Sequence, residues 1–69
     1  QNSEWNAAIE YLAYSTELQP KNVPALNNLA IAYIKTNQPQ KALDTWKSSL
    51  KIEYNPEIDK NIQIVEQSI

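Results

Sequence analysis

Four prolines limit how this chain can fold more than any other feature, because proline breaks the interior of a helix or of a sheet. They stand at positions 20, 24, 39 and 56 of the 69 residues. The stretches between them have the length of ordinary helices, and their apolar residues recur three and four positions apart. No stretch alternates with a period of two. The sequence therefore predicts an all-α fold of about four helices.

The expected helices cover residues 3–18, 23–36 and 39–53, and a fourth begins at Asn55–Pro56. Asn22 is expected to cap the second helix, and Pro24 suits its first turn. Asn37, followed three residues later by Gln40, resembles a capping box and tolerates the left-handed conformation of a tight turn. The second and third helices are therefore expected to be antiparallel neighbours.

Each expected helix has one apolar stripe that should face the core. The residues of these stripes are Trp5, Ala8, Ile9 and Leu12; Leu26, Leu29, Ala30, Tyr33 and Ile34; Ala42, Leu43, Trp46, Ser49, Leu50 and Ile52; and Ile58, Ile62, Val65 and Ile69. Tyr11 and Tyr14 lie outside the first stripe and face either a further helix or solvent. Asp44 and Lys47, one turn apart, are expected to form a weak pair on a solvated face.

The chain also resembles itself. A shift of 34 residues aligns Ala8 with Ala42, Ile9 with Leu43, Leu12 with Trp46, Ser15 with Ser49 and Leu18 with Ile52. The first and third helices are thus versions of one element. A fixed period of this size is typical of a solenoid, whose units each expose an apolar face that only a stacked neighbour covers.

The stretch from Val23 to Pro56 resembles one tetratricopeptide repeat, a helix–turn–helix unit with this period. The residues that carry the resemblance are Leu26, Leu29, Ala30, Tyr33, Ala42 and Trp46. Ala30 stands where the family usually has a small glycine, Asn37 replaces the turn glycine, and Ser49 replaces a common alanine. The closing proline matches at Pro20 in the upstream copy, whereas Pro56 comes two residues late. None of these departures conflicts with the fold.

The resemblance implies one tetratricopeptide-like domain over residues 1–69, the C-terminal end of a longer array. Residues 1–22 would be the second helix of a preceding repeat, 23–54 a complete repeat and 55–69 a capping helix. The first helix would then lack its own partner and expose part of the Trp5 stripe. Such a surface favours a homo-oligomer, formed by exchange of helices between chains.

In this family the first helices of successive repeats line a concave groove that binds extended peptides. The face of the second helix opposite its apolar stripe would contribute Asn28, an uncovered Ile31 and Lys35, with Asn27 at its margin. An amide can donate to and accept from a peptide backbone, and lysine attracts a carboxylate. The resemblance thus implies a protein–protein interaction module. The alternative is a structural scaffold that self-associates and holds no groove ligand.

Composition argues against most other functions. The chain has no Cys, His, Met or Gly, and six basic against eight acidic residues give a net charge of −2. Without His or Cys, an enzyme, a metal site and a cofactor are not expected. Nucleic acid is discounted because no basic patch is present, and no apolar run is long enough for membrane insertion. A soluble chain is expected; the compartment stays open, with the cytoplasm slightly favoured.

Overall fold

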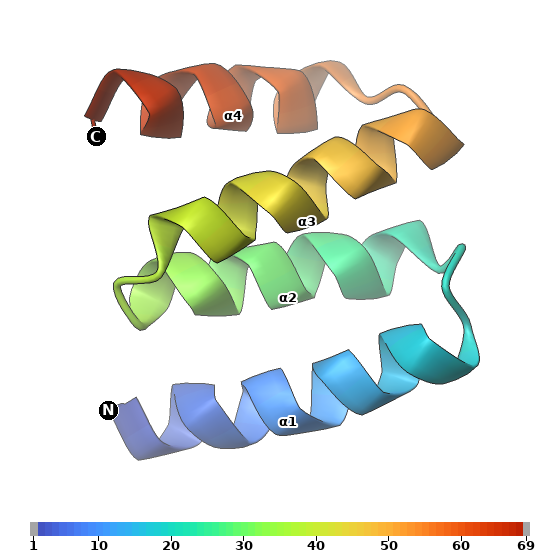
Figure 1. The fold of residues 1–69 in the computed structure, drawn as a ribbon, viewed down its shortest axis with the longest axis vertical. Coiled ribbons are helices and arrows are strands. Elements are labelled where there is room, and N and C mark those ends of the chain that lie inside the picture. Colours follow the sequence, from blue (N-terminus) through green and yellow to red (C-terminus); the bar gives the residue numbers. More distant parts are fainter. Residues whose placement is uncertain (1, 69) are drawn as a thin grey trace.

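The computed structural model describes residues 2–68, which form four α-helices joined by short turns (Figure 1). They are α1 (Asn2–Leu18), α2 (Val23–Lys35), α3 (Pro39–Ile52) and α4 (Pro56–Ser68). Within these residues there is no strand, so the predicted all-α class is confirmed. The helices begin and end within about two residues of the positions that the prolines and caps predict.

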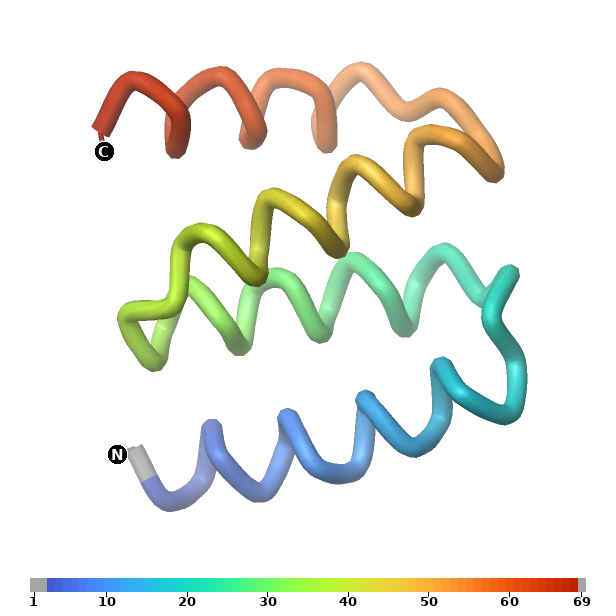
Figure 2. Tube along the Cα trace, viewed as in Figure 1, coloured from blue at the N-terminus to red at the C-terminus, as the bar shows by residue number. Residues whose placement is uncertain are grey.

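Successive helices run in opposite directions and lie in one row from α1 to α4 (Figure 1). Helix α2 packs against α1 and α3, and α3 packs also against α4. The trace in Figure 2 shows that α1 and α4 form the two edges of this row. The two edge helices therefore have fewer neighbours than α2 and α3.

Asparagine side chains cap the N-termini of two of the helices. The Oδ1 atom of Asn22 accepts a hydrogen bond from the backbone N–H of Ala25 at 3.2 Å, which caps α2 as predicted. The Oδ1 atom of Asn55 accepts from the backbone N–H groups of Glu57 and Ile58 at 2.8 and 3.3 Å. These bonds satisfy backbone donors that a helix start otherwise leaves without a partner.

The turn between α2 and α3 confirms one prediction and corrects another. Asn37 has φ of 61°, the left-handed conformation that the sequence predicts for it. The predicted capping box of Asn37 and Gln40 is wrong, because Gln38 is the N-cap of α3 and makes no side-chain capping bond. Asn37 serves as the turn residue, one position before the cap. The turn gives the antiparallel arrangement of α2 and α3 that the sequence predicts.

One buried cluster of the core lies between α2, α3 and α4. It consists of Ala30, Ala42, Leu43, Trp46, Ile58 and Ile62, with Val23, Ile31, Tyr33, Ile34, Leu50 and Val65 packed around it. The other buried apolar residues are Ala25, Leu26, Leu29 and Ala32 of α2. Most of the predicted stripes are therefore buried or half-buried. The prediction that Ile52 points inward is wrong, because this last residue of α3 is 39% exposed and does not belong to the cluster. Ile69 lies outside the described residues.

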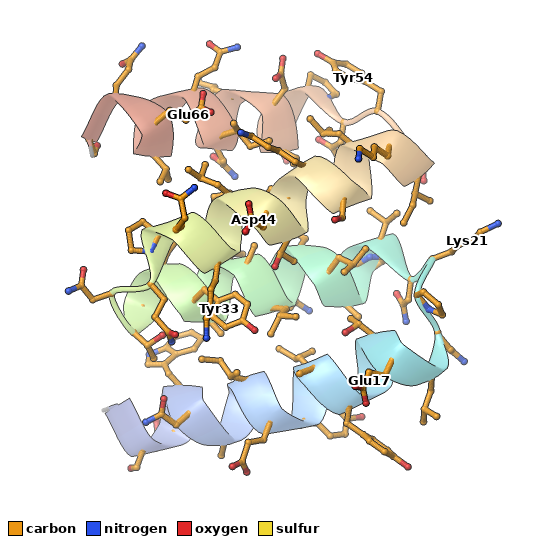
Figure 3. All side chains as sticks on the ribbon, viewed as in Figure 1. Glu17, Lys21, Tyr33, Asp44, Tyr54 and Glu66 are labelled. Atoms are coloured by element: carbon orange, nitrogen blue, oxygen red, sulfur yellow. The ribbon has the colours of Figure 1, made fainter. Side chains whose placement is uncertain are left out.

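Helix α1 has no fully buried residue among positions 3–18. Its Trp5 stripe is only half-buried, as expected for a helix that packs against one neighbour. On the other edge, Lys47 of α3 pairs with Glu66 of α4, whose carboxylate lies 3.1 Å from the ammonium (Figure 3). The predicted pairing of Lys47 with Asp44 is thus wrong. A partner on the next helix competes successfully with one on the same helix.

Candidate functional site

The outer face of α2 carries the residues that the sequence predicts for a groove. Asn28 and Lys35 are both exposed, and they lie seven residues apart, which is about two helical turns and therefore the same face. Pro24 is exposed one turn before Asn28. Neither the Asn28 amide nor the Lys35 ammonium has a side-chain partner within the described part of the chain. We call Pro24, Asn28 and Lys35 the α2 strip.

Ile31 does not lie uncovered on this strip, as the sequence predicted. It is half-buried and packs against the core cluster, to which α4 contributes Ile58 and Ile62. A projection of α2 alone shows only which residues share a face, and it does not show where α4 lies. Ile31 therefore lies at the apolar border of the α2 strip, where only part of its side chain is exposed.

Asn27 has a structural role that the sequence analysis missed. The indole N–H of Trp46 donates a hydrogen bond to Asn27 Oδ1 at 2.9 Å, and this bond joins α2 to α3. A buried indole N–H needs an acceptor, and that need was the available signal in the sequence. The amide N–H2 of Asn27 is the part of this side chain left for other contacts.

A hollow of about 380 Å³ lies between the C-terminal ends of α2 and α4. Its lining residues are Ile34, Asn37, Pro39, Ile64, Val65 and Ser68. Ile64 is 52% exposed and also lines a second, more polar hollow with Glu57, Lys60 and Asn61. The sequence analysis missed Ile64 because it falls outside the buried edge of α4. The residue of α2 that lines this apolar hollow is Ile34, which directly precedes Lys35 in the sequence.

The model of the tetratricopeptide repeat family matches residues 1–60 of the chain. The chain belongs to this family. Neither the comparison with curated proteins nor that with solved structures finds a match. Tetratricopeptide repeats generally mediate protein–protein interactions and are typically non-catalytic modules. A protein partner is thus the typical class of ligand in this family, and the binding residues have to be argued from the structure.

The electrostatics of this tetratricopeptide chain show one notable interaction, at the junction of α3 and α4. One tyrosine has a shifted pKa: the negative charge of Asp59 raises the pKa of Tyr54, whose hydroxyl donates to Asp59 Oδ2 at 3.2 Å. This pair lies at the junction of α3 and α4, away from the α2 strip (Figure 3). Across residues 2–68, no three acidic, histidine or cysteine side chains come together as a metal site.

Lys35 belongs to the last turn of α2, where the helix dipole favours a cation. Helix α2 carries no acidic residue, so nothing on its own surface neutralises this charge. In the described part of the chain, none of the helices is both long and apolar enough to cross a bilayer. The α2 strip thus presents one amide and one cation to the surroundings.

Proposed function

We propose that the chain binds an extended peptide segment of a partner protein along the α2 strip. The observation that carries the proposal is the joint exposure of Asn28 and Lys35 on one face of α2, beside the apolar hollow at Ile64. Folding does not require either side chain, since neither is buried or bonded to another side chain. Their exposure on one face makes them available to a ligand.

Each group has a distinct part in this proposal. The Asn28 amide donates to and accepts from the peptide backbone, and the Lys35 ammonium attracts an acidic side chain or a terminal carboxylate. Asn27 adds an N–H donor only, because its oxygen is occupied by Trp46. Ile31 and the hollow lined by Ile34 and Ile64 supply apolar contacts for a ligand side chain.

The arrangement of the domain belongs to the same proposal. Residues 23–54 act as one complete repeat, residues 1–22 as the second helix of a preceding repeat, and residues 55–69 as a closing helix. The match of the family model to residues 1–60 and the similarity of α1 to α3 support this division. In such an array α2 and α4 stand side by side as groove-lining helices, which agrees with the hollow between them.

The test uses a displayed library of random peptides, selected on the full chain, followed by affinity measurements on the enriched peptides by fluorescence anisotropy. The double variant Asn28→Ala, Lys35→Ala should weaken their binding by about tenfold or more, because both polar contacts are lost. Ser48→Ala, an exposed position on α3, is the matched control and should bind as the wild type does. Circular dichroism checks that all variants are equally helical.

Unchanged affinity in the double variant would contradict the proposal. If no peptide is enriched at all and the chain self-associates in light scattering, the scaffold alternative is favoured. If the double variant loses binding and keeps its helical content, the result supports peptide binding along the α2 strip.

A further inference from the structure

A second surface lies on the outer side of α1. Tyr11, Tyr14 and Leu18 are 71%, 61% and 66% exposed, and with the exposed Ala7 they share one helical face. We call these four residues the outer stripe. A hollow of about 280 Å³ adjoins it, lined by Tyr11, Ser15, Leu18, Gln19 and Asn22. Large apolar side chains gathered on an exposed face are a feature of interaction sites.

Stacking of a further repeat does not account for the outer stripe. The shift of 34 residues that relates α1 to α3 places Tyr11 on Thr45, Tyr14 on Ser48 and Leu18 on Ile52. Helix α3 has neighbours on both sides, α2 and α4, and yet Ser48 and Ile52 stay exposed while Thr45 is half-buried. A helix added beside α1 in the same manner would therefore leave the outer stripe accessible.

The positions that stacking does cover are different ones. In α3 they are Ala42, Leu43 and Trp46, all buried. Their equivalents in α1 are Ala8, Ile9 and Leu12, which belong to the Trp5 stripe. The outer stripe thus corresponds to the solvated surface of α3, where threonine and serine suffice. The fold gives no reason for two tyrosines there.

The charged residues of α1, which border the outer stripe, are all acidic. Glu4, Glu10 and Glu17 are exposed, and α1 contains no basic residue (Figure 3 labels Glu17). At about 100° per residue, Glu10 and Glu17 border the stripe on one side and Glu4 on the other. An apolar and aromatic face with acidic borders complements a segment that carries apolar side chains and cations.

We propose that the outer stripe binds a lysine- or arginine-bearing amphipathic segment of a partner protein. The apolar side chains of the partner segment cover Leu18 and the adjoining hollow. The cations of the segment lie over the rings of Tyr11 and Tyr14 or pair with the glutamates of α1. The chain already holds one such contact, in which the ammonium of Lys41 lies 5.8 Å from the ring centroid of Tyr33. This site is separate from the α2 strip.

A second copy of the chain fits this surface less well. Two α1 helices facing each other would bring glutamates against glutamates. Helix α4, the other edge of the row, has three acidic residues against one lysine and repels α1 as well. The charges therefore favour a basic partner over self-association.

The test compares two synthetic amphipathic peptides with leucines at helical spacing. One carries arginine on both borders of the leucine face, and the other carries glutamate at the same positions. Binding is measured by fluorescence anisotropy of the labelled peptide across a salt series. The variant Tyr11→Thr, Tyr14→Ser places on α1 the residues that α3 has at the equivalent positions. Both sites are exposed, so the variant should melt at the same temperature as the wild type.

We expect the arginine peptide to bind the wild type, and the Tyr11→Thr, Tyr14→Ser variant to bind it about tenfold more weakly or worse. Glu10→Gln, Glu17→Gln should also weaken binding and reduce its dependence on salt. Tyr54→Ser, an equally exposed tyrosine on the far side of the chain, and Asn28→Ala, Lys35→Ala should leave this binding unchanged.

Three results would overturn the proposal. The first is that the arginine peptide does not bind, or that the glutamate peptide binds equally well. The second is that the double tyrosine variant binds like the wild type. The third is that light scattering finds a dimer of the wild type that the same variant dissociates, which would assign the outer stripe to a second copy.

Discussion

Helices α1 and α3 are two versions of one element, and they differ most in how deeply their equivalent apolar residues lie. Trp46 of α3 is 3% exposed and its indole N–H is bonded to Asn27, whereas its equivalent in α1, Leu12, is only half-buried. Both helices carry a similar apolar stripe. The difference comes from their neighbours, because α3 packs between α2 and α4 while α1 packs against α2 alone. In a repeat stack, burial is decided by position in the row as much as by the helix itself.

The largest effects are expected when Trp46 and its equivalent Leu12 are truncated in turn. Trp46→Ala should lower the free energy of unfolding by about 3–5 kcal/mol, because it opens a cavity in the core and leaves Asn27 Oδ1 without its donor. Leu12→Ala should cost only about 1–2 kcal/mol, because Leu12 is only half-buried. Urea denaturation followed by circular dichroism measures both. Equal losses would show that α1 and α3 contribute alike.

The equivalent serines Ser15 and Ser49 give a smaller effect of opposite sign. Ser49 is fully buried and its Oγ has no hydrogen-bond partner, which is unfavourable for a hydroxyl. Ser49→Ala should therefore raise the free energy of unfolding by about 1 kcal/mol. Ser15 is half-buried and its hydroxyl reaches water, so Ser15→Ala should change stability by less than about 0.5 kcal/mol. Loss of stability in Ser49→Ala would indicate that its hydroxyl does have a partner.

A third prediction concerns how much the ion pair between Lys47 of α3 and Glu66 of α4 stabilises the fold. Both side chains are about half exposed, and the pair is therefore expected to stabilise the fold by at most about 0.5 kcal/mol. Lys47→Ala should show this loss at low salt and none at high salt. Thermal unfolding at two salt concentrations measures it, with Lys51→Ala, an exposed lysine outside this pair, as the control. A loss that persists at high salt would mean that the lysine acts through packing.

The smallest expected effect is on the titration of Tyr54 at the end of α3. The negative charge of Asp59 favours the neutral phenol and so raises the pKa of Tyr54 in the folded chain. A group with a raised folded pKa adds stability below its unfolded pKa of 10.0, and this contribution is lost as the pH rises through the folded pKa. Asp59→Asn should lower the pKa of Tyr54, which NMR of the tyrosine ring can follow. An unchanged pKa of Tyr54 in this variant would contradict the assignment.

Most of the fold could be predicted from the sequence, because prolines, caps and apolar spacing are local signals. They predict where each helix lies, and the left-handed Asn37 follows from the chemistry of a tight turn. Apart from the capping box of Asn37 and Gln40, the predictions that failed depended on another helix. The exposure of Ile52 and the pairing of Lys47 with Glu66 follow from where α4 lies relative to α3. The pattern of one helix does not contain that information.

The candidate site was less predictable for the same reason. Asn28 and Lys35 were found because their exposure follows from the face opposite the buried stripe. Ile31 and Asn27 lie at the border between faces, where contacts with the core cluster and with Trp46 decide their role. Ile64 belongs to the candidate site only because it lines a hollow that separate helices form together. Residues that lie between helices are the hardest to assign from a single chain.

The bond between Asn27 and Trp46 gives the chain an optical reporter beside the α2 strip. Indole emission responds to the hydrogen bond that the indole N–H donates. Asn27 lies at the margin of the α2 strip, and its Oδ1 atom accepts this bond from Trp46. A ligand that draws on the amide of Asn27 would alter that bond, and the emission wavelength of Trp46 would report it without any label. Replacing Trp5 by phenylalanine leaves Trp46 as the single tryptophan. The wavelength of the intrinsic fluorescence would then report whether a ligand occupies the α2 strip.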